Sequence, residues 1–242
     1  MGTIAGNLFL WSNYHWERNG NEWSDPWGGS QNLWRYVILP RISKFIPAHN
    51  ILEIAPGYGR WTEYLLPYCS GEYWGVDLTP KCIDVCKKEF VKSSYHWVVN
   101  DGKDLSFIPD NSLDFVFSFD SLVHVEIDVI DAYLKQLGRK MKVGSFGFIH
   151  HSNSKSIGGQ KCKIEDEAGR SLSVGYEAVK ILCEEANLIC CSQEQLTWQT
   201  NRLIDCFTLF TKGGVKVEYR NITNPDFYSQ SALIAKVASL YS

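Results

Sequence analysis

One segment of this chain of 242 residues combines an apolar run with two closely spaced glycines. Residues 51–60 read ILEIAPGYGR, in which a strand-like run leads into a turn at Gly57 and Gly59. Glycine lets a backbone turn approach a ligand closely, and a helix that begins after such a turn offers free N–H groups. Asp77 ends the next apolar run, where a carboxylate can accept hydrogen bonds from the hydroxyls of a ribose. The segment therefore predicts a nucleotide-binding turn.

This turn requires a sheet beneath it, and from residue 50 onward short apolar runs alternate with amphipathic ones. We expect strands at residues 50–55, 72–77, 95–99, 112–119, 144–150, 188–197 and 203–212. We expect helices at residues 60–68, 79–91, 128–141 and 174–187. The alternation implies parallel units, and the short connection between the last two strands implies a hairpin. The prediction is an α/β fold with a seven-stranded mixed sheet and an antiparallel C-terminal hairpin.

The glycine pattern distinguishes between nucleotide-binding families. A dinucleotide fingerprint G-x-G-x-x-G would read Ala55, Gly57 and Arg60, and the phosphate-binding loop G-x-x-x-x-G-K-[ST] is absent. The pattern E-x-G-x-G-x-G is met by Glu53, Gly57 and Gly59, with alanine in place of the first glycine. The chain thus resembles the class I S-adenosylmethionine-dependent methyltransferases. Ala55 is a departure that puts the geometry of the turn in doubt, but not the cofactor.

The resemblance covers roughly residues 50–212 and implies a Rossmann-like methyltransferase fold that binds S-adenosylmethionine. It implies that Asp77 holds the ribose, that Asp101 approaches the adenine amine, and that Glu53 holds either the methionine amine or the turn. The implied cofactor-binding residues are Glu53, Ala55, Gly57, Gly59, Arg60, Asp77, Leu78, Asp101, Gly102, Phe119 and Asp120. The whole chain forms one methyltransferase domain, in which residues 50–212 are the catalytic core and residues 213–242 a C-terminal extension.

Methyl transfer from a sulfonium is an in-line displacement, so the enzyme mainly positions the acceptor, although a hydroxyl acceptor also benefits from a base. Histidine is the usual base near neutral pH. His124 follows the fourth strand, while His150 and His151 end the fifth. Strand alternation sends His150 and His151 to opposite faces, so we favour His151 as the base, with His124 beside it. Each histidine could instead be a hydrogen-bonded residue that packs a strand end.

Residues 1–49 precede the catalytic core and contain five of the nine tryptophans, namely Trp11, Trp16, Trp23, Trp27 and Trp34. Residues 1–29 show no clear period, whereas Ser30–Ile46 reads as a helix broken at Pro40. In the family that the chain resembles, such a segment often forms a lid over the cofactor and the acceptor. Aromatic faces also suit sugar rings or cationic groups. We expect a helical, aromatic lid, with Trp34 in the core; packing on the domain surface is the alternative.

Composition excludes several classes of partner. The 24 basic and 27 acidic residues form no dense basic run, so no nucleic-acid partner is expected. No apolar run reaches about 18 residues, so no membrane span is expected. The eight cysteines contain no C-x-x-C pair, which favours free buried thiols in a reducing cytoplasm. The histidines show no metal-ligand spacing, so we expect no metal.

These observations predict S-adenosylmethionine-dependent methyl transfer to a small-molecule or saccharide acceptor, with oxygen favoured over nitrogen as the accepting atom. A general likeness to methyltransferases that modify bacterial surface polysaccharides supports a saccharide. The alternatives are a small-molecule N-methyltransferase and a noncatalytic methyltransferase-like binding domain. Transfer to DNA amines is disfavoured, because Phe119-Asp120-Ser121-Leu122 lacks the signature [DNS]-P-P-[YFW]. The oligomeric state stays open.

Overall fold

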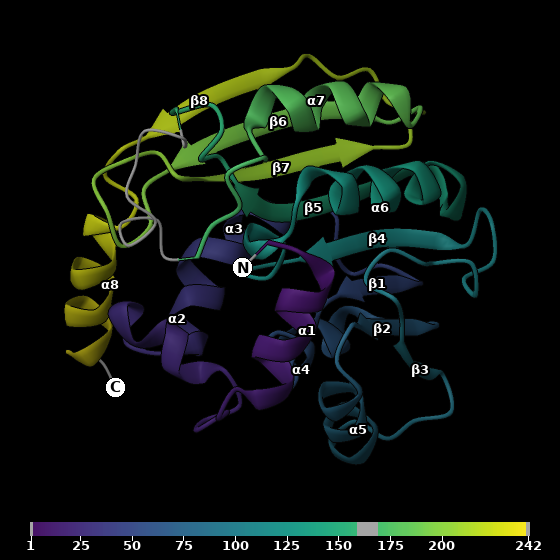
Figure 1. The fold of residues 1–242 in the computed structure, drawn as a ribbon, viewed down its shortest axis with the longest axis horizontal. Helices are drawn as coiled ribbons and strands as arrows, with labels where there is room; N and C mark the ends of the chain where they lie inside the picture. Colours follow the sequence, from purple (N-terminus) through teal and green to yellow (C-terminus); the bar gives the residue numbers. More distant parts are fainter. Residues whose placement is uncertain (1, 159–168, 241–242) are drawn as a thin grey trace.

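A single mixed sheet of eight strands crosses the molecule (Figure 1). The computed structural model describes residues 2–158 and 169–240. The strands are β1 (Ile51–Ile54), β2 (Tyr73–Asp77), β3 (Tyr95–Val99), β4 (Leu113–Ser118), β5 (Met141–Ser152), β6 (Ile189–Leu196), β7 (Asp205–Thr211) and β8 (Arg220–Asn224). Their order is β3-β2-β1-β4-β5-β7-β6-β8. The α/β class, the mixed sheet and the antiparallel pairing of β6 with β7 are as predicted.

The sheet separates two hydrophobic cores because successive side chains of a strand point to opposite faces. In β1, Leu52 and Ile54 pack with the apolar sides of α6 (Ile127–Lys140) and α7 (Tyr176–Glu185). Ile51 packs on the other face, with residues of α4 (Thr62–Leu65), of α5 (Pro80–Glu89) and of the N-terminal helices. The central strands are thus buried on both faces, which is the environment of a parallel sheet between helical layers.

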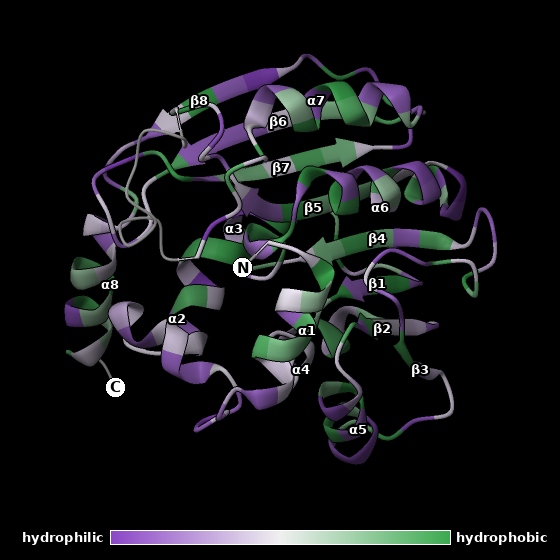
Figure 2. Ribbon diagram, viewed as in Figure 1, coloured by the Kyte–Doolittle hydropathy of each residue, from purple (hydrophilic) through white to green (hydrophobic). Residues whose placement is uncertain are grey.

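The eighth strand is a correction to the predicted count of seven. It comes from residues 213–242, where β8 pairs in parallel with β6 and is followed by α8 (Ser229–Ser239). The sequence RNITN of β8 lacks the alternation of a half-buried strand, and four of its five residues are exposed. Figure 2 shows β8 as largely hydrophilic, in contrast to β4 and β7. An exposed edge strand of this kind offers no hydrophobic pattern by which to predict it.

The N-terminal segment is helical through most of its length. Its elements are α1 (Ile4–Asn13), η1 (Asn21–Trp27), α2 (Ser30–Leu33), the π-helix η2 (Trp34–Ile38) and α3 (Leu39–Ile42). The predicted break at Pro40 is wrong, since the backbone stays helical to Ile42. The Leu39 amide bonds the Trp34 carbonyl in a π-turn, and Pro40 stands in the first turn of α3, where its missing N–H costs little.

The cysteine prediction is confirmed for the residues that the structure describes. Seven cysteines are free and buried, and Cys162 lies outside the described residues. Within the described ranges, no cluster of three potential ligands could hold a metal ion. No helix among the described residues is long and apolar enough to cross a membrane.

Candidate functional site

The turn after β1 has a left-handed backbone at all three positions of the glycine pattern. The φ angles are +59° at Ala55, +59° at Gly57 and +88° at Gly59. A Cβ atom at residue 57 would lie 2.8 Å from the Trp16 ring, and one at residue 59 would lie 2.3 Å from Phe90. Both glycines are therefore required by sterics as well as by φ. Ala55 adopts the same conformation at a cost in strain, which is the physical meaning of its departure from the pattern.

Asp77 ends β2 and faces this turn. Its Oδ2 atom accepts a hydrogen bond from the Gly57 N–H at 3.1 Å, and its Oδ1 atom accepts one from the Thr79 N–H at 2.8 Å. Burial raises the pKa of the carboxyl above its ordinary value, against these two hydrogen bonds. Asp77 thus connects the turn after β1 to the start of α5, and it lines the cavity at this edge of the sheet.

That cavity encloses about 750 Å³, including space open to solvent. Six of the expected cofactor-binding residues line it, namely Ala55, Gly57, Asp77, Leu78, Gly102 and Asp120. The opposite wall comes from the N-terminal segment, which contributes Ile4, Asn7, Trp11, Trp16 and Trp23. Most of its lining is apolar, as is usual for a site that holds an organic cofactor.

Five expected cofactor-binding residues do not line the cavity, and three of them, Glu53, Gly59 and Phe119, are buried in the protein interior. Glu53 accepts hydrogen bonds from the Thr62 hydroxyl at 2.6 Å and the Tyr73 hydroxyl at 2.5 Å. Burial raises the pKa of Glu53 to about 7, against these hydrogen bonds. Of the two roles expected for Glu53, the structure thus favours support of the turn. Gly59 is covered by Phe90, and Phe119 is buried in the core.

Asp101 also lies away from the cavity, so the structure does not bring its carboxylate to the expected adenine position. The side chain is exposed, and its Oδ1 atom accepts hydrogen bonds from the N–H groups of Lys103 and Asp104, both at 2.8 Å. These bonds lower the pKa of Asp101. The carboxylate is occupied by its own turn, and the cavity wall there is formed by Gly102 and Tyr133.

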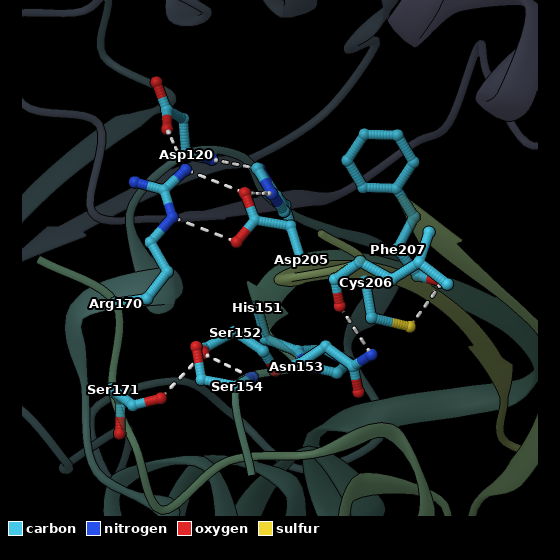
Figure 3. Close-up of polar contacts among 12 residues, drawn as sticks. Asp120, His151, Ser152, Asn153, Ser154, Arg170, Ser171, Asp205, Cys206 and Phe207 are labelled. Atoms are coloured by element: carbon cyan, nitrogen blue, oxygen red, sulfur yellow. Dashed lines mark hydrogen bonds and ion pairs between the residues drawn. The ribbon is translucent and has the colours of Figure 1, made fainter. Parts of the chain in front are cut away.

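Arg60, the fifth of these residues, belongs to a buried chain of ion pairs. Figure 3 shows the part of this chain formed by Asp120, Arg170 and Asp205. Arg60 donates from Nη2 to Oδ2 of Asp120 at 2.8 Å. Arg170 donates to both carboxylate oxygens of Asp205, at 2.9 and 2.7 Å, and its Nη2 lies 3.9 Å from Asp120. Burial alone would raise the pKa of Asp205, but Arg170 and His150 hold it well below its ordinary value. These four charges cancel, so the chain of ion pairs is neutral.

His150 contacts both aspartates of this chain of ion pairs, Asp120 through its backbone N–H and Asp205 through its carboxylate. Its Nδ1 atom accepts a hydrogen bond from the Asp120 N–H at 3.1 Å, so the ring proton is on Nε2, which lies 3.0 Å from Asp205. His151 faces away, as strand alternation requires, and bonds the Thr208 hydroxyl at 2.7 Å. Burial lowers the pKa of His151 to about 4. Because both rings are fully buried and outside the cavity, the preference for His151 as the base is not supported by the geometry.

His124 is the predicted histidine that does reach the cavity. Its Nδ1 atom lies 2.9 Å from the Gly169 carbonyl and so carries the ring proton. Burial and the charge of Arg170 lower the pKa of His124 to about 4. The ring is therefore neutral at physiological pH, and among the described residues no hydrogen bond engages Nε2.

A second pocket adjoins the first and shares four residues with it, namely Trp11, Trp23, Asp120 and His124. It is completed by Leu10, Tyr14, Arg170, Trp198 and Gln199. Arg170 and Trp198 were not singled out in the sequence. Neither belongs to a sequence motif, so no local pattern pointed to them. Both side chains line the second pocket, and the Arg170 guanidinium lies 5.7 Å from the centroid of the Trp198 ring.

The N-terminal tryptophans divide into two groups. Trp11, Trp16 and Trp23 line the cavity and contact one another, with ring centroids 5.2 to 6.1 Å apart. Trp27 and Trp34 are buried in the core at 1% and 6% exposure. The expectation that Trp34 is a core residue is confirmed, and the other three line the wall where the lid was expected.

Comparison with known proteins agrees with this geometry. Residues 51–144 match the family described as a methyltransferase domain. Over 110 residues the chain is 30% identical to Nodulation protein S of Sinorhizobium fredii, which covers 43% of this chain and 50% of that protein. The chain thus matches only about half the length of this relative.

Solved structures share the fold at low sequence identity. The N-methyltransferase NodS of Bradyrhizobium japonicum, in complex with S-adenosyl-L-homocysteine, aligns with a TM-score of 0.58 and 18% identity over 86% of this chain and 95% of that one. An S-adenosylmethionine-dependent methyltransferase of Clostridium acetobutylicum aligns with a TM-score of 0.57 and 14% identity over 79% and 92%. Residues 51–144 therefore form a methyltransferase domain, and the chain has the Rossmann-like fold of the class I S-adenosylmethionine-dependent methyltransferases.

Proposed function

We propose that this chain binds S-adenosylmethionine in the cavity at Asp77 and transfers its methyl group to a small-molecule or saccharide acceptor. The observation that carries this proposal is the pair of adjoining pockets, which share Asp120 and His124. One pocket is built on the glycine turn and Asp77, and the other is walled by aromatic side chains. The cofactor, when bound, supplies a methyl group activated by a positively charged sulfur.

The residues of the first pocket fit this cofactor. Each oxygen of Asp77 accepts one backbone hydrogen bond and keeps a lone pair for a ribose hydroxyl. Two buried polar atoms of the opposite wall, Nε1 of Trp16 and Oδ1 of Asn7, have no hydrogen-bond partner among the described residues. Such atoms are rare in folded proteins and are satisfied when a polar ligand enters.

The second pocket suits an acceptor with an apolar face and polar edges. Trp11, Tyr14, Trp23 and Trp198 offer aromatic faces, on which a sugar ring or an amine can pack. Asp120 and Arg170 supply an acceptor and a donor at the same pocket, and their charges are balanced by Arg60 and Asp205. A pocket without net charge favours a neutral or weakly charged acceptor over a polyanion.

The sequence favours oxygen as the accepting atom, and His124 is the residue that would remove the proton from a hydroxyl acceptor. Nε2 of His124 holds the free lone pair of a neutral ring, but a pKa near 4 makes it a weak proton acceptor. A nitrogen acceptor needs no base once it is deprotonated. Nitrogen is therefore the second candidate, and it gains support from the N-methyltransferase among the structural neighbours.

The test is methyl transfer to matched acceptors, an amino sugar and the same sugar with hydroxyl in place of the amine. Calorimetry with S-adenosylhomocysteine comes first, and a chain that does not bind it is not a methyltransferase. His124→Ala should lower kcat by about 100-fold or more for a hydroxyl, as expected for loss of a general base, but far less for an amine. Cofactor binding without transfer to any acceptor would favour the noncatalytic reading.

A further inference from the structure

The N-terminal helix α1 contributes Ile4, Asn7 and Trp11 to the lining of the proposed cofactor cavity. In Figure 1 it sits beside the end of β4 that bears the arrowhead. Ile4 covers Gly102, with side-chain atoms 3.3 Å from where a Cβ of that glycine would stand. Two turns later the Trp11 ring lies 5.4 Å from the His124 ring. The helix therefore passes from the loop after β3 to the loop after β4, with Asn7 between these two contacts.

The orientation of the Asn7 carboxamide is determined by its neighbours. Its Nδ2 atom donates to the carbonyl oxygen of His124 at 2.9 Å and to that of Gly2 at 3.5 Å. A flipped amide would place an oxygen against two carbonyl oxygens, so Oδ1 must be the atom that points away from them. The side chain is 4% exposed and lines the cavity, and Oδ1 has no partner among the described residues.

We propose that Oδ1 of Asn7 accepts a hydrogen bond from the adenosyl part of the bound cofactor. The inference rests on the proposed function, since it requires that cofactor in this cavity. A carbonyl oxygen needs a donor, and the adenosyl part offers an amine and two ribose hydroxyls. In the proposed binding mode the adenine lies toward Gly102, on which Ile4 packs, and Asn7 follows Ile4 by one helical turn. The methionine then lies toward the glycine turn, on which Trp16 packs.

The consequence is a clamp formed by two distant segments of the chain. Asp77 would hold the adenosyl group from the sheet, and Asn7 would hold it from α1. Because Asn7 also bonds the loop after β4 through Nδ2, cofactor binding and docking of α1 stabilise each other. The N-terminal segment then belongs to the cofactor site as well as to the acceptor pocket.

The first experiment measures binding by calorimetry with two ligands, S-adenosylhomocysteine and methylthioadenosine, which lacks the amino acid. Asn7→Ala should weaken both by about 3- to 10-fold, the value of one net hydrogen bond. Asn13→Ala is the matched control, since Asn13 is an exposed asparagine of the same helix whose Nδ2 atom donates to the Phe9 carbonyl and to no other described residue. Unchanged affinity in Asn7→Ala, or a loss confined to S-adenosylhomocysteine, would overturn the proposal.

The second experiment uses the unmodified chain, so it does not depend on how well Asn7→Ala folds. Hydrogen exchange of the amides in Ile4–Asn13 should slow on saturation with either ligand, because each carries the adenosyl donors. Exchange that is unchanged by both ligands would refute the clamp. Failure of the chain to bind S-adenosylhomocysteine at all would instead refute the proposed function, which distinguishes the two.

Discussion

The two sides of the proposed cofactor cavity are built by different means. On the sheet side, backbone conformation dominates, with left-handed residues in the turn after β1 and a carboxylate at the end of β2. On the N-terminal side, the wall consists of side chains, namely Ile4, Asn7, Trp11, Trp16 and Trp23. A backbone turn binds ligands that share one shape, whatever the rest of their structure. A wall of side chains can be altered by single substitutions. The sheet side therefore suits a common cofactor, and the N-terminal side suits a particular acceptor.

The same contrast occurs within the N-terminal segment itself. Trp16 stacks on Tyr58 at the cavity, with ring centroids 4.6 Å apart. Trp27 packs in the core against Trp198 at 4.9 Å. The two residues are identical and only eleven positions apart, so residue type did not assign their roles. Four predictions test this division between scaffold and site, beginning with the largest expected effect.

Replacement of a core tryptophan should cost far more stability than replacement of a cavity tryptophan. Trp27→Ala should lower the free energy of unfolding by about 3–5 kcal/mol, as for a buried aromatic side chain. Trp11→Ala should cost about 1 kcal/mol or less but should raise the acceptor KM, because Trp11 lines both pockets. Urea unfolding and steady-state kinetics measure the two effects, and equal stability losses would contradict the division.

Glu53 should make stability depend on pH. Its pKa is about 7 in the folded chain, above the ordinary value of 4.5, so the folded state binds this proton more tightly than the unfolded state. The contribution of Glu53 is therefore fully present below about pH 4.5 and falls by on the order of 3 kcal/mol as the pH rises to about 7. Glu53→Gln should remove this fall, and unfolding curves that stay parallel to wild type across this range would disprove it.

The two aspartates expected at the cofactor should behave differently. Asp77→Ala should weaken binding of S-adenosylhomocysteine by about 1.5–3 kcal/mol, the cost of removing a charged hydrogen-bonding partner. Asp101→Ala is the control and should bind as wild type, because that carboxylate is exposed and engaged in its own turn. Calorimetry compares the three proteins. If only Asp101→Ala binds S-adenosylhomocysteine more weakly than wild type, then Asp101 and not Asp77 contacts the cofactor.

The smallest effect is expected at Ala55, where glycine should be stabilising. Ala55→Gly removes the strain of a left-handed alanine at φ +59° and adds backbone entropy to the unfolded chain. The net gain should be about 0.5 kcal/mol in thermal or urea unfolding. Ala132→Gly in the middle of α6 is the matched control, and there the same change should cost about 1 kcal/mol. A loss at both positions would show that the turn carries no strain.

The extent of sequence prediction follows from how local each signal is. Hydrophobic periodicity and glycine positions are signals that extend over only a few residues. They were sufficient to predict the strands β1 to β7, the hairpin and the turn at Gly57. The polar edge strand β8 lacks that period and was missed. The sequence correctly placed His150, His151 and Asp101 near strand ends. It did not show that His150 contacts Asp205 and that His151 contacts Thr208, because these partners are distant in sequence. Asp101 is engaged by the N–H groups of its own turn.

The sequence by itself determined the α/β fold, the glycine turn, the position of Asp77 at the end of β2 and the likeness to methyltransferases, because each depends on local spacing along one strand–turn–helix unit. Only the tertiary structure decided which tryptophans line the cavity, that His124 reaches it while His151 does not, and that Arg170 joins Asp120 to Asp205. Those outcomes depend on which chain segments pack together, and hydrophobic burial and charge pairing across the fold determine that packing.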